Sequence, residues 1–272
     1  MDPTETTRDR IRFASFLAPN MFDVYGFMAD YVGERLGRHT ELTVGRSFDE
    51  FAEGAADIGF LCGLPYVELA RQPHPPVELL AAPVLTGERY GGRPIYFSDV
   101  IVRADSHFGS FSELRGSVWA FNDPDSHSGY NVTRHRLVSM GETGGFFGRV
   151  VEAGSHQRSI KMVCSGEIDA AAIDSHVLAV ELRDRHALRE QIKVIDTLGP
   201  AGIQPVVAAS RLPDGLKAAV REALLAMNED PAARAVLTSS FVERFVAVTD
   251  DDYEDVLAML VAAEDADFMT IR

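Results

Sequence analysis

The sequence alternates between strand-like and helix-like segments along most of its length, and this alternation constrains the fold more than any other feature. Between residues 23 and 36, apolar side chains recur at helical spacing, and Gly37 follows where a left-handed helix end is favoured. Short apolar runs that predict strands alternate with further helical segments at residues 41–44, 57–61 and 77–85. Such alternation is typical of a sheet covered by helices, so we predict an α/β fold with mostly parallel sheets.

A long alternating stretch at residues 94–102 interrupts this pattern. It is longer than a simple interior strand, and we interpret it as a crossing into a second α/β lobe. Residues 198–205 hold two glycines and two prolines, which favours a return crossing, after which residues 206–209 rejoin the first sheet. A chain of 272 residues is long enough for two lobes. The first predicted lobe comprises residues 1–97 and 206–272, and we predict that its C-terminal remainder is helical. The second predicted lobe comprises residues 98–205.

The chain carries 41 acidic and 26 basic residues, which gives a net charge of −15. Such a surface repels nucleic acid and anionic lipid headgroups, so we expect neither as a partner. No apolar run reaches the roughly 18–20 residues that span a bilayer, so we expect no direct membrane insertion. Residues 1–12 lack the basic and apolar regions of an export signal, so we expect a cytoplasmic protein or a chain whose leader was removed.

The spacing of cysteine and histidine argues against a metal centre. Cys62 and Cys164 each lie in an apolar stretch and do not form a ligand pair, so we predict buried thiols. The eight histidines show no convincing metal spacing, and the phosphate-loop, nucleophile-elbow and dinucleotide-binding motifs are absent from the sequence. We therefore expect no metal, no cofactor and no catalytic residues.

The segment NDPDSHSGY at residues 122–130 is the most informative one for function. It places Ser126, His127, Ser128 and Gly129 between a predicted strand and a predicted helix. Hydroxyls and free backbone N–H groups at a helix N-terminus bind anions without needing a lysine. The alternative interpretation is that Ser128 only caps the helix.

Further candidates follow other predicted strands. His156 lies in the segment GSHQRS and would donate to an oxyanion when protonated, unless it is a surface or capping histidine. Asp174 follows a strand at the carboxyl edge, where open α/β sheets bind ligands, although it would equally cap the next helix. Tyr66 follows a first-lobe strand and Tyr96 lies on the crossing, where their hydroxyls suit a cleft, although such residues are more often core or rim.

Five segments, in their order and spacing, resemble the phosphate-, phosphite- and phosphonate-binding proteins of ABC importers. They are GFLCGLPYVELA, YFSDVIVR, WAFNDPDSHSGY, GSHQRSIKMVCSGEIDAAAIDS and LGPAGIQPVV. The resemblance covers roughly residues 11–227, and the SHSGY and GSH motifs are its most specific parts. It implies the two-lobed type II periplasmic-binding-protein fold, in which two crossing strands join lobes that are each a sheet flanked by helices.

The resemblance also implies a function, namely capture of a small phosphonate, phosphate or phosphite in a cleft between the lobes. The protein would be the substrate-binding component of an ABC transporter, with a permease as partner and no enzyme activity. Asp174 would receive a ligand amine, but Gln204 is neutral where aminophosphonate binders carry a second acidic residue, which argues against an amine-bearing ligand. His127 replaces the threonine common between the two serines. The residues that this resemblance places on the ligand are Tyr66, Tyr96, Ser126, His127, Ser128, Gly129, His156, Asp174 and Gln204.

The alternative is a cytoplasmic enzyme or ligand sensor on the same fold, similar to chorismate dehydratase or to the enzyme that builds the thiamin pyrimidine. The missing leader favours this alternative. The serine and histidine segments, and the absence of a distinctive catalytic pair, favour binding. Turnover distinguishes the two functions, because a binding protein returns its ligand chemically unchanged.

Overall fold

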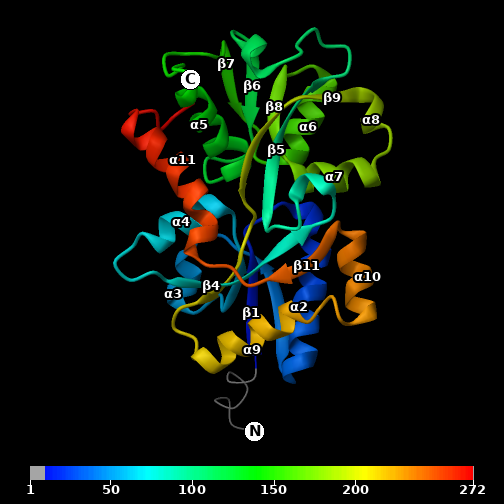
Figure 1. Cartoon of the computed structure of the whole chain (residues 1–272), viewed down its shortest axis with the longest axis vertical. Helices are drawn as coiled ribbons and strands as arrows, with labels where there is room; N and C mark the ends of the chain where they lie inside the picture. Colours follow the sequence, from blue (N-terminus) through cyan, green and yellow to red (C-terminus); the bar gives the residue numbers. More distant parts are fainter. Residues whose placement is uncertain (1–9, 272) are drawn as a thin grey trace. The chain divides into compact units, whose positions relative to one another are not determined.

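The computed structural model describes residues 10–271 and divides the chain into two compact units (Figure 1). Unit 1 takes in the residues up to Pro94 together with Ile203–Asp252. Unit 2 takes in Ile95–Gly202 and the residues from Tyr253 onward. Each unit has its own sheet with helices packed on it, so the predicted α/β architecture is confirmed.

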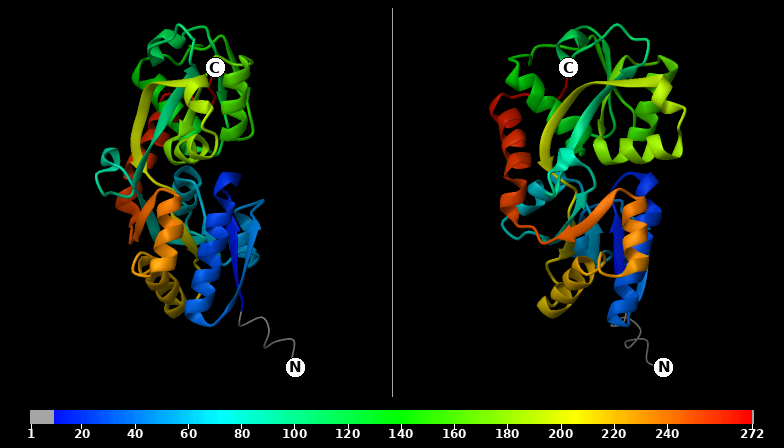
Figure 2. Two further views of the ribbon diagram at one scale, coloured as in Figure 1. Left: turned by 90° about the vertical axis from the view of Figure 1, so that its right-hand side faces the viewer. Right: turned by 45° about the vertical axis from the view of Figure 1, so that its right-hand side comes forward.

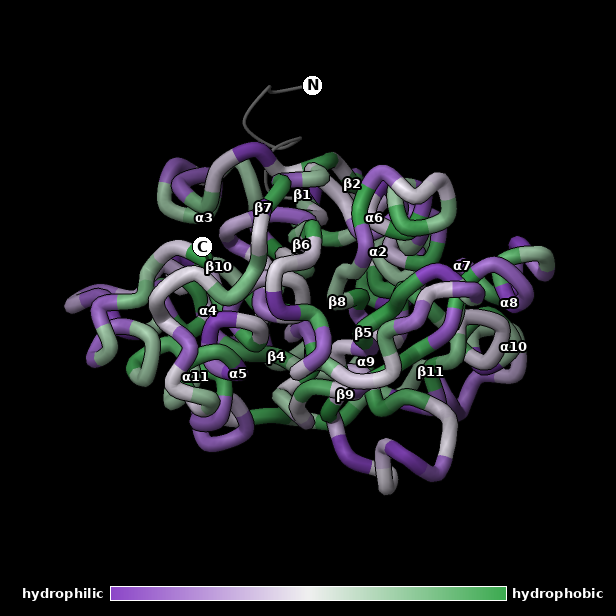
Figure 3. Tube along the Cα trace, turned by 90° about the horizontal axis from the view of Figure 1, so that it is seen from above, coloured by the Kyte–Doolittle hydropathy of each residue, from purple (hydrophilic) through white to green (hydrophobic). Residues whose placement is uncertain are grey.

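Unit 1 contains a six-stranded sheet in the order β11-β4-β10-β3-β1-β2. Strand β4 carries hydrophobic residues along most of its length (Figure 3), as expected for an interior strand of a covered sheet. The elements of this unit are β1 (Arg10–Ser15), η1 (Pro19–Met21), α2 (Phe22–Leu36), β2 (His39–Val44), α3 (Asp49–Glu53), β3 (Ile58–Phe60), α4 (Gly63–Ala70), β4 (Val77–Leu85), η2 (Glu88–Tyr90), β10 (Val206–Ala209), α9 (Asp214–Leu225), α10 (Pro231–Ser239), β11 (Val242–Val246) and η5 (Asp250–Tyr253).

Unit 2 contains a five-stranded sheet in the order β7-β6-β8-β5-β9. The long strands β5 and β9 pair along most of their length (Figure 2). The elements of this unit are β5 (Ile95–Arg103), η3 (Phe111–Leu114), β6 (Val118–Phe121), the π-helical turn η4 (His127–Asn131), α5 (Val132–Ser139), β7 (Arg149–Glu152), α6 (His156–Ser165), β8 (Ala170–Asp174), α7 (Ser175–Asp184), α8 (Leu188–Gln191), β9 (Ile192–Gly202) and α11 (Glu254–Asp265).

Both sheets are mixed, whereas the sequence pattern predicts mostly parallel ones. In unit 1, β1 pairs in parallel with β2 and β3, but β10 and β11 pair antiparallel with their neighbours. In unit 2, β6 pairs in parallel with β7 and β8, but β5 pairs antiparallel with β8 and β9. The reversed strands flank the points where the chain passes between units. The sequence pattern did not predict them, because apolar periodicity indicates a strand without giving its direction.

The sheet of unit 2 has an apolar layer on each face. Along β5, Val100 and Val102 point into one buried cluster, and Ile101 points into the other. This alternation follows from the two-residue period of a strand. The first layer is rich in aromatic side chains, including Trp119, which is fully buried and stacks on Phe147 with ring centroids 4.7 Å apart. Two covered faces make this sheet a rigid platform for the loops at the ends of its strands.

The C-terminal segment corrects the predicted lobe boundaries. The sequence analysis places residues 206–272 in the first lobe, but the residues from Tyr253 onward belong to unit 2. Phe268 and Ile271 are buried in the first apolar layer of unit 2, and the hydroxyl of Tyr130 donates to the backbone oxygen of Met269 at 3.0 Å. The chain therefore enters unit 2 twice, because burial of these apolar side chains decides where the segment packs.

Strand β11 corrects a second prediction, that the C-terminal remainder is helical. Val242 and Phe245 are buried, whereas Glu243 between them is exposed. The strand completes the edge of the unit 1 sheet by pairing with β4. In contrast, β10 spans residues 206–209 and returns to the first sheet as predicted.

None of the helices within residues 10–271 combines the length and apolar character that a membrane span requires.

Candidate functional site

Ser126 caps the N-terminus of the helical segment that follows β6. Its backbone is extended, and its hydroxyl oxygen accepts a hydrogen bond from the backbone N–H of Gly129 at 3.1 Å. The next five residues form the π-helical turn η4 before α5 begins. Ser126 is therefore the capping serine, whereas the sequence analysis considers that role for Ser128. Ser128 is the second residue of this turn, so its hydroxyl does not cap the helix and is available for other contacts.

Ser126, Ser128 and His156 form a buried chain of polar side chains, which we call the serine–histidine cluster. The hydroxyl oxygens of Ser126 and Ser128 lie 3.4 Å apart, and the Ser128 oxygen lies 3.0 Å from Nε2 of His156. Each of the three residues is at most 6% exposed. His156 is the first residue of α6, whose N-terminus is capped by Ser155. Two segments that the sequence marks as separate candidates, SHSGY and GSHQRS, thus meet in one place.

His127 is held by a second chain of hydrogen bonds. Nη2 of Arg134 donates to Oδ1 of Asn131 at 2.8 Å, and Nδ2 of Asn131 lies 3.2 Å from Nδ1 of His127. Because a guanidinium only donates, it fixes the amide oxygen of Asn131 toward Arg134 and the amide N–H toward His127. Nδ1 of the neutral ring therefore accepts, and Nε2 carries the proton. This relay makes His127 a hydrogen-bond donor at Nε2.

Burial keeps both histidines uncharged near neutral pH. Burial lowers the pKa of His156 to about 3. Burial also lowers the pKa of His127 to about 3, with smaller contributions in the same direction from His135 and Arg134. The serine–histidine cluster and His127 therefore present neutral donors, supported by the N-termini of η4 and α6. Neutral donors at helix starts are a recognised way to hold an oxyanion.

The backbone at position 129 lies so close to the side chain of Asn122 that only glycine fits there. A Cβ at position 129 would overlap the side-chain oxygen of Asn122, in the loop that leads out of β6. The absence of a side chain at Gly129 lets this loop fold closely over η4. This close approach explains why glycine occupies position 129, whereas its predicted contact with a ligand stays a prediction.

Tyr96 and Asp174 also belong to unit 2, but they occupy different environments. Tyr96 lies near the start of β5, is 1% exposed, and its ring centroid is 6.2 Å from that of His127. Asp174 ends β8 and caps α7, because its Oδ1 accepts from the backbone N–H groups of His176 at 2.7 Å and Val177 at 3.1 Å. The capping interpretation of Asp174 is thus the one that the geometry shows.

Tyr66 and Gln204 lie in unit 1. Tyr66 is buried on α4, and its hydroxyl donates to the carboxylate of Asp250. Burial makes the largest contribution to raising the pKa of Tyr66, and this hydrogen bond raises it further. The phenol therefore stays protonated. Gln204 is half-buried in the short segment between β9 and β10. These two residues are thus held within a different unit from the serine–histidine cluster.

Three supporting residues escape the sequence analysis. Asn131 and Arg134 follow His127 at helical spacing, four and seven residues later, so their common helix face was the signal that could have found them. Asp250 is 184 residues from Tyr66, and no local pattern predicts that pair. Within residues 10–271, no group of three or more histidine, cysteine or acidic side chains is placed to hold a metal ion.

Comparisons with known proteins point to one family. The family model for periplasmic substrate-binding proteins of phosphonate ABC transporters matches residues 13–253. Among solved structures, a binding-protein component of an ABC phosphonate transporter from Pseudomonas aeruginosa is 18% identical, with a TM-score of 0.82 over 95% of this chain and 87% of that one.

Two further solved structures resemble the chain at a similar level of identity. PhnD1 of Prochlorococcus marinus, in complex with methylphosphonate, is 16% identical, with a TM-score of 0.81 over 95% of this chain and 98% of that one. A Xanthomonas citri protein bound to ATP is also 16% identical, with a TM-score of 0.74 over 96% of this chain and all of that one (100%). At such identities these structures confirm the fold of the chain.

Proposed function

Since the chain belongs to the family of periplasmic substrate-binding proteins of phosphonate ABC transporters, we propose that it captures a small phosphonate on the serine–histidine cluster, releases it unchanged and delivers it to an ABC permease. The observation that carries this proposal is the meeting of Ser126, Ser128 and His156 within hydrogen-bond distance at two helix starts. With Nε2 of His156 donating to the Ser128 oxygen, the Ser128 hydroxyl is free to donate to an oxyanion, which would also accept from the Ser126 hydroxyl.

The relay to His127 supports the same assignment. With its Nε2 protonated, the ring donates to an acceptor rather than competing with one. A phosphonate group carries three oxygens that accept hydrogen bonds. Because Asn131 and Arg134 fix His127 before any ligand arrives, little ordering of this side chain opposes binding.

The environment of Asp174 favours a phosphonate without an amine. Both backbone N–H groups at the start of α7 already donate to its carboxylate. Gln204, the other position at which an amine would be received, is neutral. Oδ1 of Asp174 is therefore already engaged, which leaves less of this carboxylate for a ligand ammonium, and Gln204 adds no negative charge. Methylphosphonate, the ligand of the similar PhnD1 structure, is the probe that fits this reasoning.

The contact between Ser128 and His156 resembles a nucleophile and its base, but its chemistry is unsuited to catalysis. A general base works best when its pKa is near the working pH, and burial lowers the pKa of His156 to about 3. Catalytic pairs of this kind also use a third group to orient the histidine. Within residues 10–271, Nδ1 of His156 is buried without a hydrogen-bond partner. We therefore propose that the pair binds and does not react.

A thermal-shift panel on ligand-stripped protein tests the proposed ligand class. Methylphosphonate at 100 times its dissociation constant should stabilise the protein by about 2.7 kcal/mol, which raises Tm by several degrees. The panel includes phosphate, phosphite, 2-aminoethylphosphonate, sulfate, ATP and chorismate. We expect the largest shift with methylphosphonate and a smaller one with 2-aminoethylphosphonate. A shift with chorismate alone, or no shift with any phosphorus oxyanion, would contradict the proposal.

A further inference from the structure

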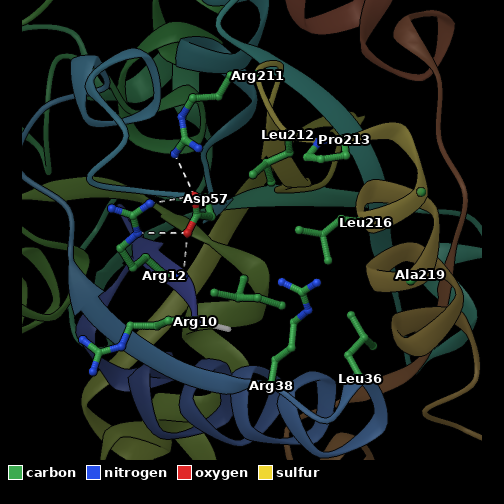
Figure 4. Close-up of a pocket in the computed structure, with 12 residues that line it drawn as sticks. Arg10, Arg12, Leu36, Arg38, Asp57, Arg211, Leu212, Pro213, Leu216 and Ala219 are labelled. Carbon is green, nitrogen blue, oxygen red and sulfur yellow. Dashed lines mark hydrogen bonds and ion pairs between the residues drawn. The ribbon is translucent and has the colours of Figure 1, made fainter. Parts of the chain in front are cut away.

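A pocket lies wholly within unit 1, whereas the serine–histidine cluster lies in unit 2. Its volume is about 650 Å³, and its walls come from the start of β1, the end of α2, the residue before β3 and the first turns of α9 (Figure 4). Ligand pockets for small organic molecules are typically about 300–1,000 Å³. This pocket is therefore large enough for an organic molecule rather than for a single small ion.

The lining of this pocket is strongly basic in an otherwise acidic chain. Four of its twelve lining residues are arginines and one is an aspartate, although the chain as a whole has a net charge of −15. The four arginines are Arg10, Arg12, Arg38 and Arg211. An anion is repelled over most of the surface of this protein, so a local cluster of guanidinium groups marks a place where an anion is attracted. We call this site the arginine pocket.

Asp57 neutralises only part of that charge. Its carboxylate accepts from Arg12 at 2.9 and 3.1 Å and from Arg211 at 2.7 Å. Burial, which alone would raise the pKa of Asp57, is outweighed by these guanidinium hydrogen bonds, so the pKa is lowered and the carboxylate stays charged. One negative charge thus faces two positive ones, and these three side chains keep one net positive charge.

Donors remain on Arg12 and Arg211 after Asp57 is satisfied. Within residues 10–271, Nη1 of Arg12 and Nη1 of Arg211 make no hydrogen bond, and both side chains are about one-third exposed, at 39% and 34%. Arg38, in the turn between α2 and β2, points into the pocket (Figure 4). Arg10 pairs with Glu41 at 3.1 Å, and both are more than half exposed, so this ion pair is weak.

Part of the lining of the arginine pocket is apolar. Leu36, Leu212 and Leu216 line it and are each half-buried (Figure 4). A ligand that covered these leucines would remove apolar surface from water, which favours binding in proportion to the area covered. The arginine pocket therefore combines charged donors with a hydrocarbon surface.

We propose that the arginine pocket is a second binding site, which takes an organic anion with an apolar body, such as a carboxylate or sulfonate carried on a hydrocarbon or aromatic group. The acidic head contacts Arg12, Arg38 and Arg211, and the body packs on the leucines. This site is independent of phosphonate binding, because none of its residues belongs to the serine–histidine cluster.

Fluorescence titration of the full chain with 8-anilinonaphthalene-1-sulfonate tests this proposal, because the probe is a sulfonate on an aromatic body. We expect saturable binding that octanoate displaces. Neither acetate, which lacks the apolar body, nor 1-octanol, which lacks the charge, should displace the probe at the same concentration. Displacement by 1-octanol as effective as that by octanoate would overturn the proposal, since the arginines would then contribute nothing.

Variants locate the site of probe binding. Arg38→Gln should weaken probe binding by about tenfold or more, because it removes a charge-assisted hydrogen bond. Arg149→Gln, at an exposed arginine on β7 in unit 2, is the matched control and should bind the probe as the wild type does. Leu216→Asp places a negative charge on the apolar wall and should also weaken binding. Equal affinities in all three variants, or no saturable binding to the wild type, would overturn the proposal.

Methylphosphonate distinguishes the arginine pocket from the phosphonate site. An excess of methylphosphonate should leave the probe titration unchanged, and Arg38→Gln should leave the thermal shift with methylphosphonate unchanged. Displacement of the probe by methylphosphonate would place the probe at the phosphonate site and overturn the second site without affecting the first.

Discussion

Replacing Ser126 and Ser128 together with alanine is expected to abolish measurable methylphosphonate binding while the protein stays folded. Each hydroxyl that donates to a charged ligand contributes about 1.5–3 kcal/mol, so the double variant should lose about 10²–10⁴-fold in affinity. Loss of the Ser126 cap should lower the free energy of unfolding by only about 1 kcal/mol. Isothermal titration calorimetry measures the affinity, and a circular-dichroism melt measures the stability.

Ser117→Ala with Ser159→Ala is the matched control for that experiment. Both residues are buried hydroxyls of unit 2 that lie outside the serine–histidine cluster, and Ser159 bonds to a backbone oxygen of its own helix. The control should bind methylphosphonate with unchanged affinity. If the Ser126 and Ser128 variant binds as tightly as this control, the cluster is not the phosphonate site.

Acid should destabilise the ligand-free protein steeply, and the buried histidines should cause much of the effect. In the unfolded chain, His127 and His156 bind protons below their ordinary pKa of about 6.5. In the folded protein they stay neutral until their pKa of about 3, because both are buried. The unfolded state therefore binds more protons between these values, and stability falls as pH falls through this range. Each histidine contributes about 1.4 kcal/mol per pH unit, and both together about 2.7.

Urea unfolding at pH 6.5, 5.5 and 4.5 measures this dependence directly. The double variant His127→Thr with His156→Gln removes both titrating groups, so its free energy of unfolding should depend less on pH, by about 2.7 kcal/mol per unit. His74→Gln, at an exposed histidine in a loop of unit 1, is the control and should keep the steep dependence of the wild type. The same slope in the double variant and in the control would show that the two histidines are not buried as neutral rings.

Local patterns predicted the elements that carry the candidate site. The apolar period of α2 and the left-handed Gly37 after it appear as expected. The helix start predicted near Ser128 lies at His127 with Ser126 as its cap, and α6 begins at His156. These features depend on residues within a few positions of one another, where propensity and capping act directly. The family resemblance, carried by motifs at those same helix starts, is confirmed by the family match.

Long-range packing explains what the sequence did not reveal. The return of the C-terminal segment to unit 2 depends on where Phe268 finds apolar partners, and the bond between Tyr66 and Asp250 joins distant parts of unit 1. The mixed sheets depend on chain direction, which apolar periodicity does not encode. The support of His127 by Arg134 runs through Asn131, and the helical spacing of these three residues was the one sequence signal that was overlooked.

The central claim is that the protein binds a phosphonate and does not transform it, and ³¹P NMR of methylphosphonate tests it most directly. With protein in slight excess over methylphosphonate, we predict that the free ³¹P resonance is replaced by a shifted, broadened one. After a day of incubation and denaturation of the protein, the full intensity should return at the original chemical shift. An unshifted resonance throughout would contradict binding, and a new phosphorus resonance after denaturation would show that the protein is an enzyme.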